Sequence, residues 1–415
     1  MTDDTDAQLA AQYEAYPYPA RDARDEAKRL VIGSPSHLRE IDYWVFGATR
    51  PESQPFQALV AGGGTGDGTI MLATHLQRRG KGGRVTYLDR SQAAMRIARA
   101  RAEARGLANI DWVEGSILDL PQLGLGRFDY IDCCGVLHHL PEPEAGLAAL
   151  EGSLAPGGGM GLMVYAPHGR TGVYMVQDAL ALLAPAEEPP AARLDVARRV
   201  MRHLPESNWL RFNRNFTDHI NGGDAGLYDL LLNPRDRAFT VSGFAALLES
   251  AGMEVAAFME PLRYDPATWL PDPKLRARAA TLPATERAAL AEALVGNMSV
   301  HIAYCRRAAE PVGRADPMDP QAVPVMREMP GAELVKSIQA DGSIAFLFDG
   351  LCAVVPLPPQ APAILQAIDG TRTVADLETL FAERGMASEK FHRAWRAVFS
   401  ALEPVNRVLL AAPKG

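Results

Sequence analysis

A cluster of glycines that follows a short apolar stretch is the feature of this sequence most able to do chemistry. An apolar run ending at Ala61 enters Gly-Gly-Gly-Thr-Gly-Asp-Gly at residues 62–68, and residues 70–73 then have helical spacing. This pattern predicts a strand, a tight turn and a helix, which bring backbone N–H groups and a helix N-terminus against a nucleotide-like ligand. Glycine allows the close approach and any positive φ that the turn requires. The loop therefore predicts binding of a cofactor that contains adenosine.

The spacing of the glycines separates two classes of cofactor. The dinucleotide fingerprint G-x-G-x-x-G fails here, because a start at Gly62 reaches Asp67 in place of the third glycine. The loop reads G-x-G-x-G instead, from Gly62 to Gly66. Residues 83–88 read as a second strand that ends at Asp89, where a carboxylate can accept hydrogen bonds from both ribose hydroxyls. A nicotinamide-dependent oxidoreductase is therefore a remote alternative.

These segments resemble the first two motifs of the class I S-adenosylmethionine-dependent methyltransferases. Residues 111–121 are similar to the third strand and adenine-binding turn of that family, and residues 154–159 to the turn before its fifth strand. Residues 127–140, which end in Gly-Val-Leu-His-His-Leu, resemble the branch that contains the quinone-ring C-methyltransferases. The resemblance implies S-adenosylmethionine as cofactor and S-adenosylhomocysteine as product. The cofactor-binding residues it implies are Ala61, Gly62, Gly63, Gly64, Thr65, Gly66, Asp89, Arg90, Ser116, Ile117, Cys134 and Gly135.

Two positions depart from the pattern of the family. Ser116 stands where an aspartate often binds the adenine amino group, which leaves Asp119 as a weaker candidate for that contact. Val60 stands where relatives usually carry an acid near the methionyl amino group, so another group has to meet that ammonium. A methyltransferase-like scaffold that has lost its activity is therefore a further alternative.

Composition narrows the class of protein. The 415 residues carry a formal net charge of −8 and are 47% hydrophobic and 22% charged, which is typical of a globular protein and argues against general nucleic-acid binding. No apolar run has the length of a membrane span, and the acidic N-terminus is unlike a signal peptide, so we expect no membrane association and a cytoplasmic location. The cysteines, histidines and acids show no recognisable ligand spacing, which predicts no metal site.

The periodicity of the apolar residues, and the positions of glycine and proline between the periodic segments, divide the chain into two domains and their connections. Alternating strand-like and helix-like segments at residues 56–165 predict a doubly wound, mostly parallel sheet with helices on both faces, in an α/β domain that spans residues 56–307. The resemblance implies seven strands, with an antiparallel last one. A helical insertion is expected at about 168–240. Residues 1–55 form an N-terminal extension that is expected either to cover the cofactor as a lid or to pack as a surface strap.

A proline-rich linker at residues 308–330 is expected to precede a small α+β, winged-helix-like domain at 331–415. Residues 333–339, 343–348 and 352–357 are predicted to be its short strands. The turn at residues 368–375 is similar to a small winged-helix family that holds peptides in ribosomal-peptide modification pathways. We expect a docking or dimerisation role ahead of peptide recognition, and a homodimer is an open alternative.

The chemistry of methyl transfer suggests which side chains to look for. Displacement at a sulfonium methyl group requires a positioned nucleophile, exclusion of water, and a base where the nucleophile carries a proton. His138 and His139 follow the fourth predicted strand and are candidate bases, unless they pack or cap the next helix. Tyr228 and His219 of the insertion are weaker candidates. We expect a small-molecule acceptor first, and a peptide or protein side chain second.

Overall fold

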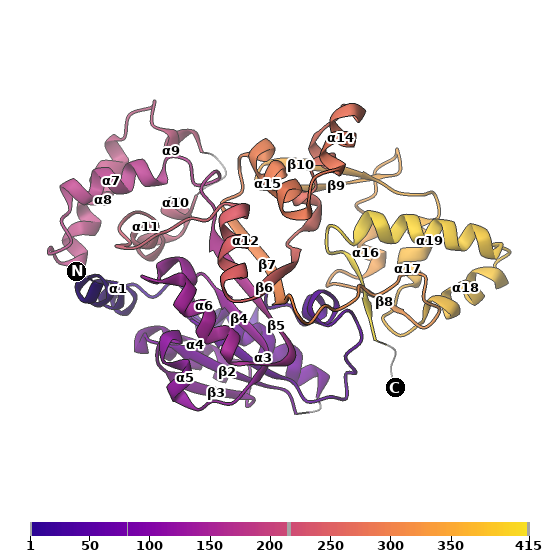
Figure 1. Ribbon diagram of the computed structural model, residues 1–415, viewed down its shortest axis with the longest axis horizontal. Coiled ribbons are helices and arrows are strands. Elements are labelled where there is room, and N and C mark those ends of the chain that lie inside the picture. Colours follow the sequence, from indigo (N-terminus) through magenta and orange to yellow (C-terminus); the bar gives the residue numbers. More distant parts are fainter. Residues whose placement is uncertain (1, 81, 214–216, 413–415) are drawn as a thin grey trace.

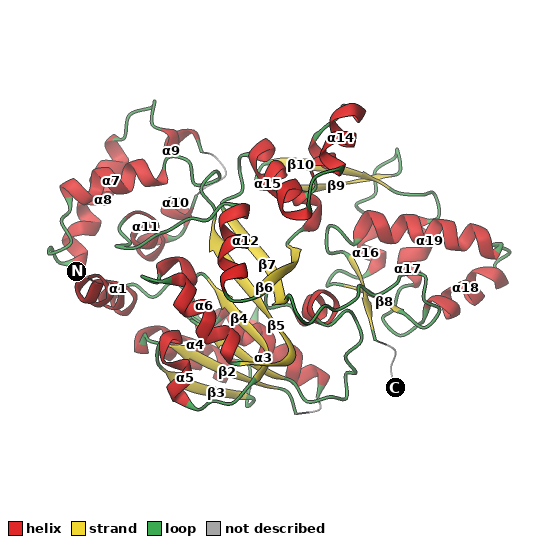
Figure 2. Cartoon of the chain, viewed as in Figure 1, coloured by secondary structure: helices red, strands yellow, loops and turns green. Residues whose placement is uncertain are grey.

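The computed structural model describes residues 2–80, 82–213 and 217–412, with a seven-stranded sheet at its centre (Figure 1, Figure 2). Its strands are β1 (Gln57–Ala61), β2 (Arg84–Asp89), β3 (Ile110–Glu114), β4 (Phe128–Cys134), β5 (Leu154–Tyr165), β6 (Met253–Phe258) and β7 (Val300–Arg307). They follow the order β3-β2-β1-β4-β5-β7-β6, and β7 runs antiparallel to both of its neighbours. This is the doubly wound, mostly parallel sheet that the sequence predicts.

Both faces of the sheet are buried, which explains the nearly continuous apolar sequence of its central strands. On β1, Val60 packs in the cluster that includes α3 (Asp67–Arg79) and α4 (Gln92–Ala104). Its neighbour Leu59 packs in a second cluster, with α6 (Pro143–Gly152) and α12 (Val241–Ser250). Successive residues of a strand point to opposite faces, so helices have to cover both sides.

The helical insertion forms a unit with its own apolar core. It contains α7 (Val173–Leu183), α8 (Pro190–His203), α9 (Trp209–Phe212), α10 (Asp218–Asn221) and α11 (Gly223–Leu231). The buried guanidinium of Arg193 links these helices, because it donates to the hydroxyl of Tyr228 at 2.8 Å and to the carbonyl of Ala184 at 3.2 Å. Figure 1 shows the insertion beside the N-terminal helix α1 (Thr2–Ala15), at the end of the molecule opposite to the C-terminal domain.

Up to residue 412, the C-terminal part contains two small antiparallel sheets and four helices. Strand β8 (Val323–Met326) pairs with β11 (Val408–Ala411), and β9 (Ser343–Phe348) pairs with β10 (Leu351–Pro356). The helices are α16 (Gly331–Val335), α17 (Ala361–Ala367), α18 (Val374–Glu383) and α19 (Ser388–Leu402). Strand β8 lies within the stretch that the sequence predicts to be a linker.

The prediction of a strand at residues 333–339 is wrong, because the chain forms α16 there. Pro330 precedes the helix at its N-cap, and a proline at a helix start removes an N–H that would have no partner inside the helix. Gly331 lets this helix pack closely on α17, since a Cβ at Gly331 would overlap the carbonyl of Leu365. Tertiary packing therefore decides the conformation of a short segment whose local pattern is ambiguous.

A bulky aromatic segment joins the sheet to the C-terminal part. It consists of α2 (Leu38–Glu40) and one π-helical turn, Ile41–Val45. The indole of Trp44 donates to Oδ1 of Asn406 at 3.0 Å, and the hydroxyl of Tyr43 donates to Oε1 of Glu403 at 3.1 Å.

The remaining helices are α5 (Leu120–Leu123), α13 (Pro266–Trp269), α14 (Pro273–Ala280), α15 (Ala284–Val295) and the 3-10 turns Ala23–Ala27, Ile117–Asp119, Leu137–His139 and Pro261–Tyr264. None of the described helices combines the length and apolar character that crossing a bilayer demands.

Candidate functional site

A cavity of about 970 Å³ lies at the carboxyl ends of the central strands. Its floor includes Val60, the glycine loop, Asp89 and the segment after β3. Its other walls include residues of α1, of the stretch 18–36, of the carboxyl ends of β4 and β5, and Asp229 of the insertion. In open α/β sheets, ligands bind in the crevice outside the carboxyl ends of the strands. The volume is at the upper end of the range for ligand pockets, about 300–1,000 Å³, so the cavity has room for more than one small ligand.

The glycine loop takes backbone conformations that other residues rarely adopt. The φ angles of Gly62, Gly64 and Gly66 are 77°, 51° and 102°. Gly63 is required for a different reason, because a Cβ there would overlap the ring of Tyr87. The loop leads directly into α3, whose first residues Asp67 and Gly68 line the cavity, and the first N–H groups of a helix have no partner within the helix.

Asp89 ends β2 beside this loop. Its carboxylate accepts hydrogen bonds from the backbone N–H of Gly64 at 2.7 Å and from that of Ser91 at 2.8 Å. Burial raises the pKa of Asp89, while these backbone hydrogen bonds oppose the increase. The glycine loop and Asp89 are thus held together before any ligand binds.

The structure brings most of the predicted cofactor-binding residues to one surface. All of them line the cavity except Ala61, whose side chain is buried in the cluster on the α6 side of the sheet. Ser116 and Asp119 form a capping box at the start of the 3-10 turn Ile117–Asp119: Ser116 accepts from the N–H of Leu118, and Asp119 accepts from that of Ser116. Ser116 therefore shapes the turn that presents Ile117 to the cavity.

Asp132 is a cavity residue that sequence reasoning missed. It lies opposite Val60 in the register between β1 and β4 and lines the same cavity. Its Oδ2 accepts a short hydrogen bond from the hydroxyl of Ser36, and its buried Oδ1 has no partner within the described part of the chain. Burial raises the pKa of Asp132 to about 6. The sequence carried one signal, an acid among the apolar residues of a predicted central strand.

A further carboxylate of the cavity wall, that of Asp229, is surrounded by donors. The hydroxyls of Tyr13 and Tyr165 donate to it at 3.0 and 3.2 Å, and the amide groups of Gln12 and Asn233 approach it at 3.4 and 3.5 Å. Burial, reinforced by the charge of Asp229, raises the pKa of both tyrosines well above the usual value. Asp229 interrupts the apolar run of α11, which is the signal that sequence reasoning overlooked.

The two adjacent histidines have different surroundings. His139 lines the cavity, and its Nδ1 lies 2.6 Å from the carbonyl oxygen of Arg235. This contact assigns the proton to Nδ1 and leaves Nε2 free to accept one. His138 is fully buried, its ring stacks on Tyr165 with centroids 3.8 Å apart, and burial lowers its pKa well below the usual value.

The two candidates from the insertion lie away from the cavity. Tyr228 is buried in the core of the insertion, where its hydroxyl accepts from Arg193 and its ring stacks on Tyr16 at 5.2 Å. His219 belongs to α10 and is not among the residues that line the cavity in the described structure. Catalytic roles for His138, His139, Tyr228 and His219 stay predictions.

Comparisons with known proteins identify the nature of the sheet domain. Residues 59–160 match the family described as "Methyltransferase domain". An uncharacterized protein of Synechococcus sp. is 32% identical over 276 residues, which cover 64% of this chain and 63% of that protein. A ubiquinone biosynthesis O-methyltransferase of Acinetobacter baylyi is 29% identical over 153 residues, which cover 37% of this chain and 60% of that protein. The chain thus spans less than two thirds of the length of these two relatives.

Two further comparisons concern more distant proteins. The ubiquinone/menaquinone biosynthesis C-methyltransferase UbiE of Methylobacterium nodulans is 28% identical over 206 residues, which cover 49% of this chain and 69% of that enzyme. The solved structure of PKMT2 from Rickettsia typhi in complex with AdoHcy has a TM-score of 0.63 and covers 91% of this chain and 75% of that chain. The sequence identity in that superposition is 14%, so the likeness is one of fold.

Proposed function

This chain carries a class I S-adenosylmethionine-dependent methyltransferase domain, and on that premise we propose that it transfers the methyl group of S-adenosylmethionine to a small-molecule acceptor. One observation carries the proposal. A continuous cavity joins the glycine loop to the carboxylate of Asp229, and every residue that lines it lies between Leu9 and Asp229. The C-terminal domain contributes none of that described lining, which favours an acceptor enclosed beside the cofactor over a peptide held by that domain.

The cofactor would extend along the floor of this cavity. In the proposed arrangement, Asp89 accepts hydrogen bonds from the ribose hydroxyls, and Ile117 lies against the adenine ring. The glycine loop supplies the N–H groups and the space for close approach. Asp132, which lies opposite Val60, meets the ammonium of the methionyl group in place of the acid usual in this family. A buried carboxylate with an unpaired oxygen is a strong counter-ion for a cation that shares its low-dielectric surroundings.

The acceptor would bind between Tyr13, Tyr165 and Asp229. When bound, S-adenosylmethionine supplies an electrophilic methyl group on a positively charged sulfur. The protein positions the acceptor nucleophile in line with the bond between sulfur and methyl carbon, and α1 excludes water. Nε2 of His139 or the carboxylate of Asp229 takes the proton that the nucleophile loses. These groups suit an acceptor with an N–H or O–H nucleophile.

Titration calorimetry tests the cofactor assignment. We expect S-adenosylmethionine to bind and the nicotinamide cofactors not to bind. Asp89→Ala should weaken binding by at least about 100-fold, because each of the two hydrogen bonds to this charged group contributes about 1.5–3 kcal/mol. Gly64→Arg should weaken it at least as much, by filling the loop.

The matched control is Gly80→Arg, at the other end of α3. Gly80 also has a positive φ, of 72°, but a Cβ there would meet no atom within 4 Å. We expect this variant to bind S-adenosylmethionine with the affinity of the parent chain. Unchanged affinity in both Gly64→Arg and Asp89→Ala would disprove the site assignment.

Incubation of a host-cell extract with radiolabelled S-adenosylmethionine tests the acceptor. We expect label in the small-molecule fraction, dependent on the added protein and lost with Asp89→Ala. Label confined to macromolecules would overturn the proposed acceptor class. Absence of label in every fraction, with cofactor binding intact, would favour an inactive scaffold.

A protein side chain is the second candidate acceptor, and one observation favours it. The helical insertion exposes several large apolar side chains, and exposed apolar surface is typical of sites that bind other proteins. These side chains are Met175, Leu182, Leu183, Trp209, Phe212 and Ile220. If a protein is the acceptor, the double variant Trp209→Ala/Phe212→Ala should reduce macromolecular labelling and leave the affinity for S-adenosylmethionine unchanged.

A further inference from the structure

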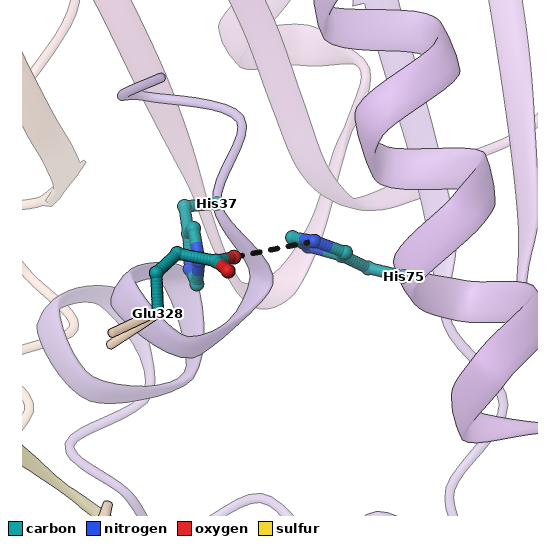
Figure 3. Close-up of side chains that lie close together, drawn as sticks. All are labelled: His37, His75 and Glu328. Carbon is teal, nitrogen blue, oxygen red and sulfur yellow. Dashed lines mark hydrogen bonds and ion pairs between the residues drawn. The ribbon is translucent and has the colours of Figure 1, made fainter. Parts of the chain in front are cut away.

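Three side chains from distant parts of the sequence meet where the sheet domain faces the C-terminal part (Figure 3). His37 immediately precedes α2, His75 lies in the second half of α3, and Glu328 follows β8. Nε2 of His37 lies 2.8 Å, and Nε2 of His75 3.8 Å, from Oε1 of Glu328. In Figure 3 the carboxylate of Glu328 lies between the two imidazole rings.

The residue types and the spacing match a known class of metal site. Imidazole nitrogens and a carboxylate oxygen are common zinc ligands, and a catalytic or open site often has three protein ligands and a water. Tetrahedral coordination with bonds of about 2.0–2.2 Å places neighbouring ligand atoms roughly 3.3 Å apart. One ligand atom from each of the three residues lies within 4.8 Å of the others. Small side-chain rotations would therefore suffice to coordinate an ion.

Burial and solvent access are distributed as such a site requires. The side chain of His37 is 2% exposed and that of His75 is 12% exposed, whereas that of Glu328 is 40% exposed. The rings meet edge to face, with centroids 4.9 Å apart. The histidines thus give the site a fixed, buried side. Glu328 lies at its open side, where an ion can enter and a water can complete the coordination.

The ligand atoms have to be deprotonated when a metal ion binds. Nε2 of His37, which lies 2.8 Å from Oε1 of Glu328, therefore has to give up the proton of that hydrogen bond when it coordinates an ion. Arg39 and Arg78 also face His75 and would weaken the attraction for a cation. Imidazole ligands suit transition metals such as Zn²⁺, whereas hard cations prefer a set of oxygen ligands.

We propose that His37, His75 and Glu328 bind a divalent transition-metal ion, with Zn²⁺ as the best match to the ligand set. The site is independent of the proposed methyl transfer, because none of the three residues lines the cavity. It would join the N-terminal extension, α3 and the C-terminal part. Its ligands are too far apart in the chain for the spacing of the sequence to predict it, which is why the sequence favoured no metal site.

Calorimetric titration of Zn²⁺ into the full-length, untagged protein, after treatment with a chelator, tests the proposal. We expect one Zn²⁺ per chain and a Tm that rises when Zn²⁺ is added. His75→Ala and Glu328→Gln should each weaken binding more than the roughly 10–100-fold that loss of a second-shell partner costs, and should abolish the rise in Tm. The matched control is His392→Ala, because His392 also pairs with a glutamate, Glu378, at 3.2 Å on the surface of the C-terminal part.

His392→Ala should bind Zn²⁺ as the parent chain does. Glu328→Gln keeps the test decisive even if a histidine variant fails to fold, since this side chain is partly exposed and the change conserves its shape. Affinity for S-adenosylmethionine should be unchanged in Glu328→Gln, which separates this inference from the proposed function. Absence of stoichiometric Zn²⁺ binding, or unchanged affinity in both His75→Ala and Glu328→Gln, would overturn the proposal.

Discussion

At the scale of single residues, Asp132 has surroundings that are best explained by a cationic ligand. It is fully buried, one carboxylate oxygen is bound by Ser36, and the other has no partner in the described ranges although the residue lines the cavity. A buried polar atom without a partner costs free energy. The Cβ that Gly68 lacks would lie 3.0 Å from Oδ2 of Asp132, so the start of α3 also approaches this carboxylate closely.

We expect Asp132→Asn to weaken binding of S-adenosylmethionine about 10–100-fold, because a hydrogen bond between charged groups contributes about 1.5–3 kcal/mol. Calorimetry at pH 7.5 measures the change. The control ligand is 5′-methylthioadenosine, which has the nucleoside and the sulfur but no amino-acid group. Its affinity should be equal in the variant and the parent chain, and an equal loss for both ligands would contradict the role given to Asp132.

The pH dependence of binding follows from the same residue. Since burial raises the pKa of Asp132 to about 6, the free protein carries a proton there below that pH, and the ammonium has to displace it. Affinity for S-adenosylmethionine should therefore be constant just above pH 7, where the amino group of the ligand is still protonated, and should fall towards tenfold per pH unit well below pH 6. Asp132→Asn should lose this slope. Measurements with 5′-methylthioadenosine report separately any contribution from Asp89, whose pKa burial also raises.

At the scale of elements, α1 is attached to several parts of the molecule by polar side chains. Oε2 of Glu14 accepts from the backbone N–H of Ala93, at 3.0 Å, and from the hydroxyl of Ser91, at 3.1 Å, at the N-terminus of α4. Asp6 pairs with Arg235 at 2.6 Å, and Tyr13 reaches Asp229 in the insertion. The sequence suggested a lid as one of two alternatives. The contacts of α1 could not be predicted from the sequence, since its partners lie up to 229 residues away in the chain.

Glu14→Ala should loosen α1 without unfolding the sheet. Hydrogen–deuterium exchange of residues 2–15 should become faster, because the helix loses its hydrogen bonds to the start of α4. Glu103→Ala, at an exposed glutamate elsewhere on α4, is the control and should leave that exchange unchanged. Saturating S-adenosylmethionine should slow the exchange in both variants. Equal exchange in Glu14→Ala and Glu103→Ala would show that these contacts do not hold α1.

At the scale of the whole molecule, the sheet domain and the C-terminal part share a continuous apolar core. Tyr43 and Trp44 belong to the same cluster of buried side chains as Phe399 and Leu402. The sequence predicted the sheet because repeated strand–helix alternation and glycine motifs are local signals. The sequence could not predict that the two parts share a core, because the hydrogen bonds of Tyr43 and Trp44 reach partners 360 and 362 residues further along the chain. For the same reason, the sequence predicted only a linker at the position of β8.

We expect the chain to unfold in one calorimetric transition, because separation of the two parts would expose this shared core. Trp44→Ala should lower the free energy of unfolding by about 3–5 kcal/mol. Trp209→Ala is the matched control: the side chain of Trp209 is 57% exposed, and such surface changes usually stay within about 0.5 kcal/mol. Two separate transitions in the parent chain would show that the interface does not couple the parts.

The position of α1 has a consequence for turnover. Through Glu14 it borders the cavity beside Ser91, and through Tyr13 it borders the same cavity beside Asp229. In the proposed arrangement, α1 therefore lies beside both the cofactor and the acceptor. We expect steady-state kinetics to show an ordered mechanism in which the cofactor enters first and S-adenosylhomocysteine leaves last. Opening of α1 would then limit the rate, and S-adenosylhomocysteine would be a strong competitive inhibitor with respect to the cofactor.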